Sequence, residues 1–267
     1  DDALDDGAAL QAFGDSLADT YQALLNAPTI TLATIADEES IAEAQNFAAN
    51  LLAPLGSTTM QADWKPQPIR EIRRECWVTN TQVNFCARAY PTVPAGHPDA
   101  AALTVLAAFL RNGFLHRAIR EQGGAYGGGA SHDANIAAFR FFSYRDPRLT
   151  ETLDDFDAAI HWLLETQHEQ LALEEAILGI VGSLDKPASP AGEAKKHFHE
   201  QLFERSIEHR RQFRQRVINT QLADLVRVAQ NYLAPENAST AIITNHHTAD
   251  ANRAALEAMG LAWRELN

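Results

Sequence analysis

A pattern of elements that occurs twice, 205 residues apart, constrains the fold of this chain most. Residues 17–56 begin with Leu-Ala-Asp, continue as a helical stretch to an Ala-Pro pair, and then give a β-rich run at 29–35, a second helix and a closing glycine. Residues 222–261 follow the same order, from Leu-Ala-Asp through Ala-Pro to a closing glycine. Self-similarity of this kind is typical of a duplicated structural unit. We therefore predict that residues 1–58 are the C-terminal tail of a preceding homologous α+β domain, that 59–70 are a linker, and that 71–267 form a complete α+β domain.

The order of elements in the complete domain predicts a layered α+β fold. Alternating side chains from Cys76 to Tyr90 predict one or two strands, and a hairpin is expected from 127–132 and 137–144. A long apolar helix should begin at Asp99 as its N-cap and end at Gly123. This mixture favours a mostly antiparallel sheet with helices packed on one face. Further helices are expected at about 149–165, 168–183, 190–203, 220–233 and 250–259.

Composition limits the classes of function that this chain can have. With 267 residues, 46% of them hydrophobic, it can bury a core. No run of about 18 apolar residues and no signal peptide is present, so we expect a soluble chain without a transmembrane segment. The sequence does not indicate its cellular compartment. The net charge is -13, and residues 1–64 contain eleven acidic residues and no Lys or Arg. This excess argues against nucleic acid as a partner and favours a solvated face, with basic peptides or a basic partner as the alternative.

Cysteine and histidine give weak signals. Cys76 and Cys86 are too few for a disulfide framework; they are either small buried side chains or a pair bridged across a turn at 79–82. His197 and His199 lie two apart on a predicted helix and therefore point to different faces, and the pair at 246–247 lies in a predicted loop. We predict no metal site in this chain.

A glycine-rich break after the long helix is the strongest candidate for chemistry. It places Arg120 and Tyr126 six residues apart, and both side chains are strong hydrogen-bond donors that can hold a carbonyl oxygen as it becomes an anion. Gly123, Gly124 and Gly127 would let a substrate approach the backbone closely. Two structural alternatives stay open: an arginine in the last turn of a helix complements the helix dipole, and a tyrosine after glycines packs on its neighbours.

Two other readings of this segment do not fit. A phosphate-binding loop would need a Lys-Ser or Lys-Thr after the glycines, and no G-x-G-x-x-G register can be placed on residues 123–129. A serine hydrolase would need a G-x-S-x-G elbow, which is absent.

Residues 115–147 resemble the C-terminal half of the pitrilysin and insulinase family of zinc peptidases, most closely its presequence protease branch. The matching runs are Ile-Arg-Glu-Gln-Gly-Gly-Ala-Tyr-Gly-Gly-Gly-Ala at 119–130 and Phe-Ser-Tyr-Arg-Asp-Pro at 142–147. The run Ser-Leu-Asp-Lys-Pro at 183–187 is also similar to that branch. The resemblance extends over residues 70–267.

The resemblance implies a zinc metalloendopeptidase that degrades unstructured peptides in a closed chamber formed by two homologous halves. The family's zinc is held by an H-x-x-E-H helix and a distant glutamate, and no such motif occurs in this chain. We therefore expect zinc and this motif in an N-terminal half of the same protein, and an inactive isolated chain. The family's arginine and tyrosine that stabilise the tetrahedral intermediate match Arg120 and Tyr126, with Arg117 as a competing arginine. The alternative is a non-catalytic scaffold or peptide-binding module of the same fold.

Overall fold

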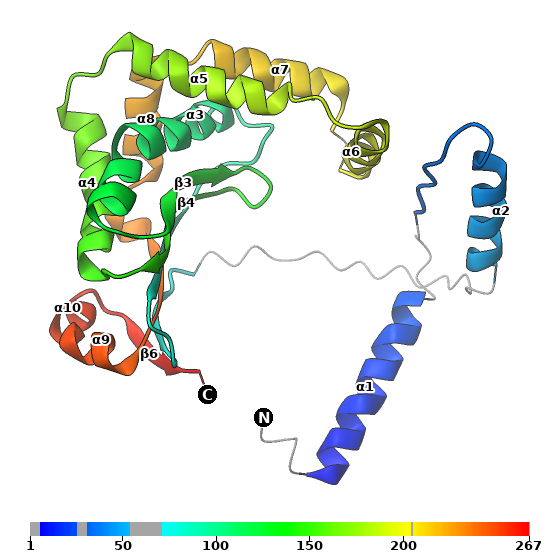
Figure 1. The fold of residues 1–267 in the computed structure, drawn as a ribbon, viewed down its shortest axis with the longest axis horizontal. Helices are drawn as coiled ribbons and strands as arrows, with labels where there is room; N and C mark the ends of the chain where they lie inside the picture. The colour runs from blue at the N-terminus through cyan, green and yellow to red at the C-terminus, as the bar shows by residue number, and fades with distance from the viewer. Residues whose placement is uncertain (1–5, 26–30, 54–70, 204, 267) are drawn as a thin grey trace. The chain divides into compact units, whose positions relative to one another are not determined.

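The computed structural model describes residues 6–25, 31–53, 71–203 and 205–266. The chain divides into two compact units, Asp1–Pro68 with Pro187–Arg205 and Ile69–Lys186 with Ser206–Asn267. The predicted linker, 59–70, lies outside the described residues. The second unit holds the sheet and the buried core (Figure 1).

The first unit contains three helices and, among its described residues, no strand. They are α1 (Gly7–Leu25), α2 (Ile41–Leu52) and α6 (Pro190–Leu202). The helix start at α6 is clear from its sequence, because the Ser189 hydroxyl accepts a hydrogen bond from the Gly192 amide and Pro190 opens the first turn. The described part of the predicted β-rich run, residues 31–35, is not a strand.

The second unit is built on a six-stranded mixed sheet. Its strands lie in the order β3-β4-β2-β5-β1-β6. The pairs β3–β4, β4–β2 and β2–β5 are antiparallel, whereas β1 runs parallel to both of its neighbours, β5 and β6. The strands are β1 (Arg74–Val78), β2 (Asn84–Pro91), β3 (Gly127–Asp133), β4 (Ala138–Asp146), β5 (Ser239–Thr244) and β6 (Ala262–Glu265).

The prediction of a mostly antiparallel sheet was therefore wrong. Two parallel strands need a long connection between them. The connection from β1 to β5 contains most of the domain, and the two strands run parallel. The crossover from β5 to β6 passes through two short helices, α9 (His246–Ala251) and α10 (Arg253–Ala258), where one helix was predicted. A strand's alternation of side chains reports burial on one face but carries no information about direction, so sequence could not distinguish the two cases.

The position of β5 also decides between the two readings of the cysteines. Cys76 on β1 and Cys86 on β2 both lie opposite Ile242, on the two sides of β5. Two strand spacings of about 4.8 Å separate their backbones, which is too far for a disulfide. Both are buried free thiols, and burial raises the pKa of Cys76 to about 11 and that of Cys86 to about 12.

Helices cover one side of the sheet and leave the other open (Figure 1). The strands show this directly, because Cys86, Arg88 and Tyr90 on β2 are buried while Ala87 between them is exposed. The core is rich in aromatic contacts, such as Phe141 on Phe156 with ring centroids 5.5 Å apart. The covering helices are α3 (Ala100–Leu110), α4 (Thr150–Glu165), α5 (Gln170–Leu184), α7 (Ile207–Ile218) and α8 (Leu222–Tyr232).

Helix α7 was not predicted, and its composition explains why. Among its residues only Val217 is buried, and most of the others are Arg, Glu, His or Gln. A helix without an apolar stripe gives no periodic signal. Asp99 also differs in detail: it precedes α3 as expected, but its carboxylate accepts hydrogen bonds from Arg227 (2.8 Å) and Tyr232 (2.8 Å) rather than capping the helix.

His132 fastens β3 to the helix layer and should make stability depend on pH. The Thr104 hydroxyl donates to the Ala100 carbonyl, so it accepts from Nδ1 of His132 (3.1 Å), while Nε2 lies 3.2 Å from the Thr92 hydroxyl. This arrangement suits the neutral ring. Burial is the main cause that lowers the ring's pKa from 6.5, against the opposing charge of Asp133.

We expect the free energy of unfolding to fall as the pH drops below about 6.5, because the unfolded chain then binds a proton at His132 that the folded chain resists. Urea unfolding of the wild type and of His132→Gln at pH 8 and pH 5 measures this. The difference between the two pH values should be smaller in the variant. The exposed His247→Gln is the control and should keep the wild-type difference. Equal pH dependence in all three proteins would contradict the prediction.

Candidate active site

The predicted arginine lies at the end of an unusual helix. Helix α3 continues directly into the π-helix η1 (Arg111–Gln122), where a single α-helix was predicted. π-Helical turns are rare and recur at functional sites. The helix ends at Gly123 as predicted, and the chain reverses through Gly124, whose φ is 78°. There the Gly124 amide donates to the carbonyl of Arg120 (3.1 Å) and the Ala125 amide to that of Ile119 (3.1 Å).

Two of the predicted substrate-contacting glycines make room for other side chains. A Cβ on Gly123 would lie 2.0 Å from a guanidinium nitrogen of Arg148, which donates to the Ala118 carbonyl (3.1 Å) and to Asp155 (2.8 Å). A Cβ on Gly127 would lie 2.2 Å from the ring of Tyr144. These contacts at Gly123 and Gly127, together with the positive φ of Gly124, explain from local structure why each of the three positions is a glycine. Their contact with a substrate stays a prediction.

Tyr126 presents its phenol outward from a fixed backbone. Its side chain is 64% exposed, and its amide donates to the carbonyl of Arg145 (3.2 Å). The ring meets the edge of Tyr144 with centroids 5.3 Å apart. No residue in the described part of the chain hydrogen-bonds its hydroxyl. The hydroxyl is therefore free to donate to a ligand.

The guanidinium that the structure places at Tyr126 belongs to Arg145, which sequence reasoning missed. Its Cζ lies 5.8 Å from the centroid of the Tyr126 ring. Asn84 pairs with Asp146 while Cys86 pairs with Ser143, so β4 has two residues opposite one of β2. Arg145 belongs to this bulge and has a φ of 49°. The only signal in the sequence was its place at the end of a strand, directly before Asp-Pro.

The contact between Arg145 and the Tyr126 ring is too weak to offset the strain of the left-handed backbone at Arg145. A left-handed conformation costs a residue with a Cβ about 1–2 kcal/mol, and an exposed cation–π contact returns about 0.5–1 kcal/mol. Glycine would adopt this conformation without strain. Packing on Tyr126 thus leaves the choice of arginine at position 145 unexplained.

Arg120 and Tyr126 are not in mutual contact in the described structure. Both are exposed, but Nη1 of Arg120 lies 3.4 Å from Nε2 of His116 in the same helix. His116 in turn approaches the carboxylate of Glu121 at 3.4 Å. The competing Arg117 is exposed as well. The structure therefore does not choose between the two arginines.

The region around the site is basic, in contrast to the acidic chain as a whole. Residues 111–148 contain six arginines, no lysine and three acidic residues. Asp133 lies 3.8 Å from Arg140, and buried Asp146 accepts from Thr152 (2.8 Å). With Glu121 beside His116, all three acids are engaged. Four exposed arginines have no acidic partner among the described residues: Arg111, Arg117, Arg120 and Arg145.

The described residues offer neither a metal site nor a membrane span. No group of three His, Cys, Asp or Glu side chains within them is close enough to hold a metal ion. The described residues therefore do not fit a zinc ion. In the same residues no helix is long and apolar enough to cross a membrane.

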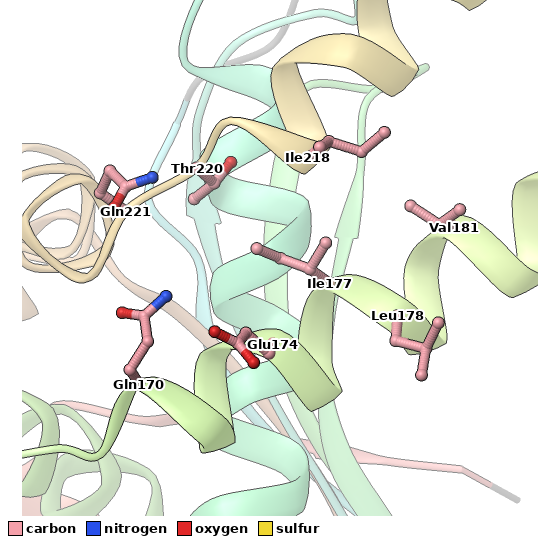
Figure 2. A pocket seen from close by; sticks show the side chains of 8 residues that line it. All are labelled: Gln170, Glu174, Ile177, Leu178, Val181, Ile218, Thr220 and Gln221. Carbon is pink, nitrogen blue, oxygen red and sulfur yellow. The ribbon is translucent and has the colours of Figure 1, made fainter.

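A groove of about 490 Å³ lies elsewhere in the second unit, on the helix layer (Figure 2). It contains none of the predicted site residues. Its lining combines apolar and polar side chains from α5, the last residue of α7 and the connection between α7 and α8: Gln170, Glu174, Ile177, Leu178, Val181, Ile218, Thr220 and Gln221.

Comparison with known proteins identifies the family. The sequence model of the family described as "PreP C-terminal domain" matches residues 74–244, which is more than half of the chain. The mitochondrial presequence protease of Kluyveromyces lactis is 36% identical over 163 residues, covering 61% of this chain and 16% of that protein. Its Drosophila melanogaster counterpart is 37% identical over 184 residues, covering 64% of this chain and 17% of that protein. The chain thus spans about one sixth of the length of these relatives.

A solved structure shows the same fold at low sequence identity. The "peptidase M16 inactive domain" of Pseudomonas fluorescens has a TM-score of 0.57 at 16% identity, over 76% of this chain and 50% of that one. Such a likeness supports the fold and no more. Together, the family match and the two relatives show that this chain belongs to the presequence protease C-terminal domain family and is a C-terminal portion of a pitrilysin-family protease.

Proposed function

We propose that this chain supplies the donors that stabilise the tetrahedral intermediate in a zinc metalloendopeptidase acting on unstructured peptides. The observation that carries the proposal is the free, outward phenol of Tyr126 in a segment that also carries exposed arginines. When a peptide bond is attacked, its carbonyl oxygen gains negative charge, and fixed donors stabilise that charge more than the neutral oxygen. Tyr126 would donate its hydroxyl proton in a hydrogen bond, and Arg120 would supply a charged donor.

The zinc and the attacking water would come from another part of the protein. We propose that an N-terminal half carrying H-x-x-E-H holds the metal and closes a peptide chamber with this portion. The short span of this chain within its relatives supports such a partner. An isolated chain of this sequence would then be inactive.

The exposed face of α1 supports the proposal that residues 1–58 are the tail of a preceding homologous domain. In the second unit, the repeat's counterpart α8 buries Leu225 and Val228 in the core. Helix α1 also carries an apolar stripe, and no described residue buries it, which would be costly for an isolated helix. We propose that the remainder of that domain covers it. The stripe consists of Leu10, Phe13, Leu17, Tyr21 and Leu24, which are 45–66% exposed.

The open face of the sheet supports unstructured peptides as the substrate class. Phe142, Tyr144 and Ile243 point away from the covering helices and are 37%, 39% and 37% exposed. Phe85 on β2 lies opposite Ile243, so apolar side chains from neighbouring strands form one surface. Unfolded peptides expose apolar side chains that folded proteins bury, and such a surface favours them.

The alternative is a non-catalytic module of the same fold. The match of both Arg120 and Tyr126 to the family's pair of donors argues against it, because a scaffold has no reason to keep donors for an oxyanion.

The test compares Arg120→Ala with Arg117→Ala in the full-length protein at equal zinc content. If Arg120 donates to the intermediate, its loss should lower kcat/KM for an unstructured peptide at least about 10-fold, as expected for a hydrogen bond from a charged group. Arg117→Ala should stay within about twofold. The reverse order would assign the role to Arg117. Absence of cleavage by the zinc-loaded wild type would favour the scaffold.

A further inference from the structure

We propose that Arg145 is a substrate-binding residue that donates from its guanidinium to a carbonyl oxygen of a peptide bound beside Tyr126. The proposal rests on the proposed function in one respect, that the surface around Tyr126 receives peptides. It adds a residue that neither the sequence motif nor the family match assigns to the site.

The backbone of Arg145 is the first support. Its φ of 49° lies in the left-handed region, which glycine adopts freely and asparagine tolerates. Residues in strained conformations occur where the surrounding structure fixes them, often at functional sites. Bulges also redirect side chains at such sites. We therefore attribute the arginine at this position to a function of its side chain, because its backbone conformation favours glycine.

The surroundings of the guanidinium are the second support. Arg145 is exposed, and within the described residues no carboxylate pairs with it. Within the described residues the one contact of the guanidinium is with the ring of Tyr126, and its Cζ lies 5.8 Å from the ring centroid. The planar guanidinium has five N–H donors, and contact with a ring face engages none of them in a conventional hydrogen bond. All of these donors are available to a ligand.

The third support is the coupling between Arg145 and Tyr126. The Tyr126 amide donates to the Arg145 carbonyl, so one backbone hydrogen bond fixes the start of β3 to the end of β4. Gly127 pairs with Tyr144 directly beside this bond. The backbone positions that carry the phenol and the guanidinium are therefore held together. A peptide whose carbonyl lies at the Tyr126 hydroxyl would pass within reach of Arg145.

The test is peptide binding to the full-length protein with its metal removed by EDTA, so that binding is measured without turnover. Fluorescence anisotropy would follow an unstructured, fluorescein-labelled peptide. Arg145→Gly should raise Kd about 10-fold, which corresponds to about 1.4 kcal/mol. Arg145→Asn should raise Kd by a similar factor, because asparagine also tolerates the left-handed conformation at this position. Arg145→Lys should lie between them and the wild type, because it keeps the charge without the planar donors.

Ala137→Gly is the matched control. Ala137 has the other positive φ among the described residues that are not glycine, 52°, and lies in the turn between β3 and β4. Relief of strain alone would affect both glycine variants alike, so Ala137→Gly should bind within twofold of the wild type. Both Arg145→Gly and Arg145→Asn binding within twofold, or a wild type that does not bind the peptide, would overturn the assignment.

Turnover measured in parallel with zinc restored separates this inference from the proposed function. A protein that binds the peptide through Arg145 but never cleaves it would refute the hydrolytic role and support the Arg145 contact. A protein that cleaves the peptide and depends on Tyr126, but binds equally well without Arg145, would do the opposite.

Discussion

Replacing Tyr126 by phenylalanine in the full-length protein should lower kcat for peptide cleavage about 10²-fold to 10³-fold, the usual effect of losing one oxyanion donor. The substitution removes a single oxygen atom. Because the ring is held by Tyr144 and by the backbone bond to Arg145, it should keep its place. The interaction is made mainly in the transition state, so KM should change little. Steady-state kinetics at equal zinc content measure both quantities.

Tyr90→Phe is the matched control for this experiment. It removes the same oxygen from a buried core ring whose hydroxyl, among the described residues, makes no hydrogen bond of normal geometry. Loss of an unpaired buried hydroxyl should leave stability unchanged or increase it, and kcat should stay at the wild-type value. A fall in kcat for Tyr90→Phe as large as that for Tyr126→Phe would point to a general effect of the substitution. Unchanged kcat in Tyr126→Phe would exclude the phenol as a donor.

Local features of the fold could be predicted from sequence. The hairpin of β3 and β4 was predicted within two residues of its observed ends, and the predicted end of the long helix at Gly123 agrees with its C-cap. The candidate residue Tyr126 could be singled out because it lies in a run of glycines. Each of these signals lies within a few residues of the feature that it predicts.

Features that depend on distant partners could not be predicted. The direction of β1 relative to β5 is fixed by residues more than 160 positions apart, such as Arg74 and Thr240. Helix α7 buries only Val217, so its sequence has no apolar stripe from which the helix could be predicted. The contact of Arg145 with Tyr126 arises from a bulge opposite β2, and nothing in the run from 142 to 147 alone specifies it.

Gly123→Ala should destabilise the second unit by about 2–3 kcal/mol, the largest effect on stability that we expect from a change of one methyl group at the site. The new Cβ would lie 2.0 Å from the Arg148 guanidinium and 2.5 Å from the Ile119 carbonyl oxygen. Arg148 would have to leave Asp155 and the Ala118 carbonyl. The side chains of Arg148 and Asp155 are 25% and 21% exposed, so solvent moderates the loss of the ion pair.

Thermal unfolding of the chain measures this effect, which corresponds to a fall in Tm of roughly 5–10 °C for a unit of this size. Gly124→Ala tests the other possible reason for a glycine at this helix end. Gly124 has a φ of 78°, but its new Cβ would meet only Pro147, at 3.5 Å. Backbone strain alone should then cost about 1 kcal/mol. If Gly123→Ala costs no more than Gly124→Ala, the packing of Arg148 is not what requires glycine at position 123, and contact with substrate becomes the stronger explanation for it.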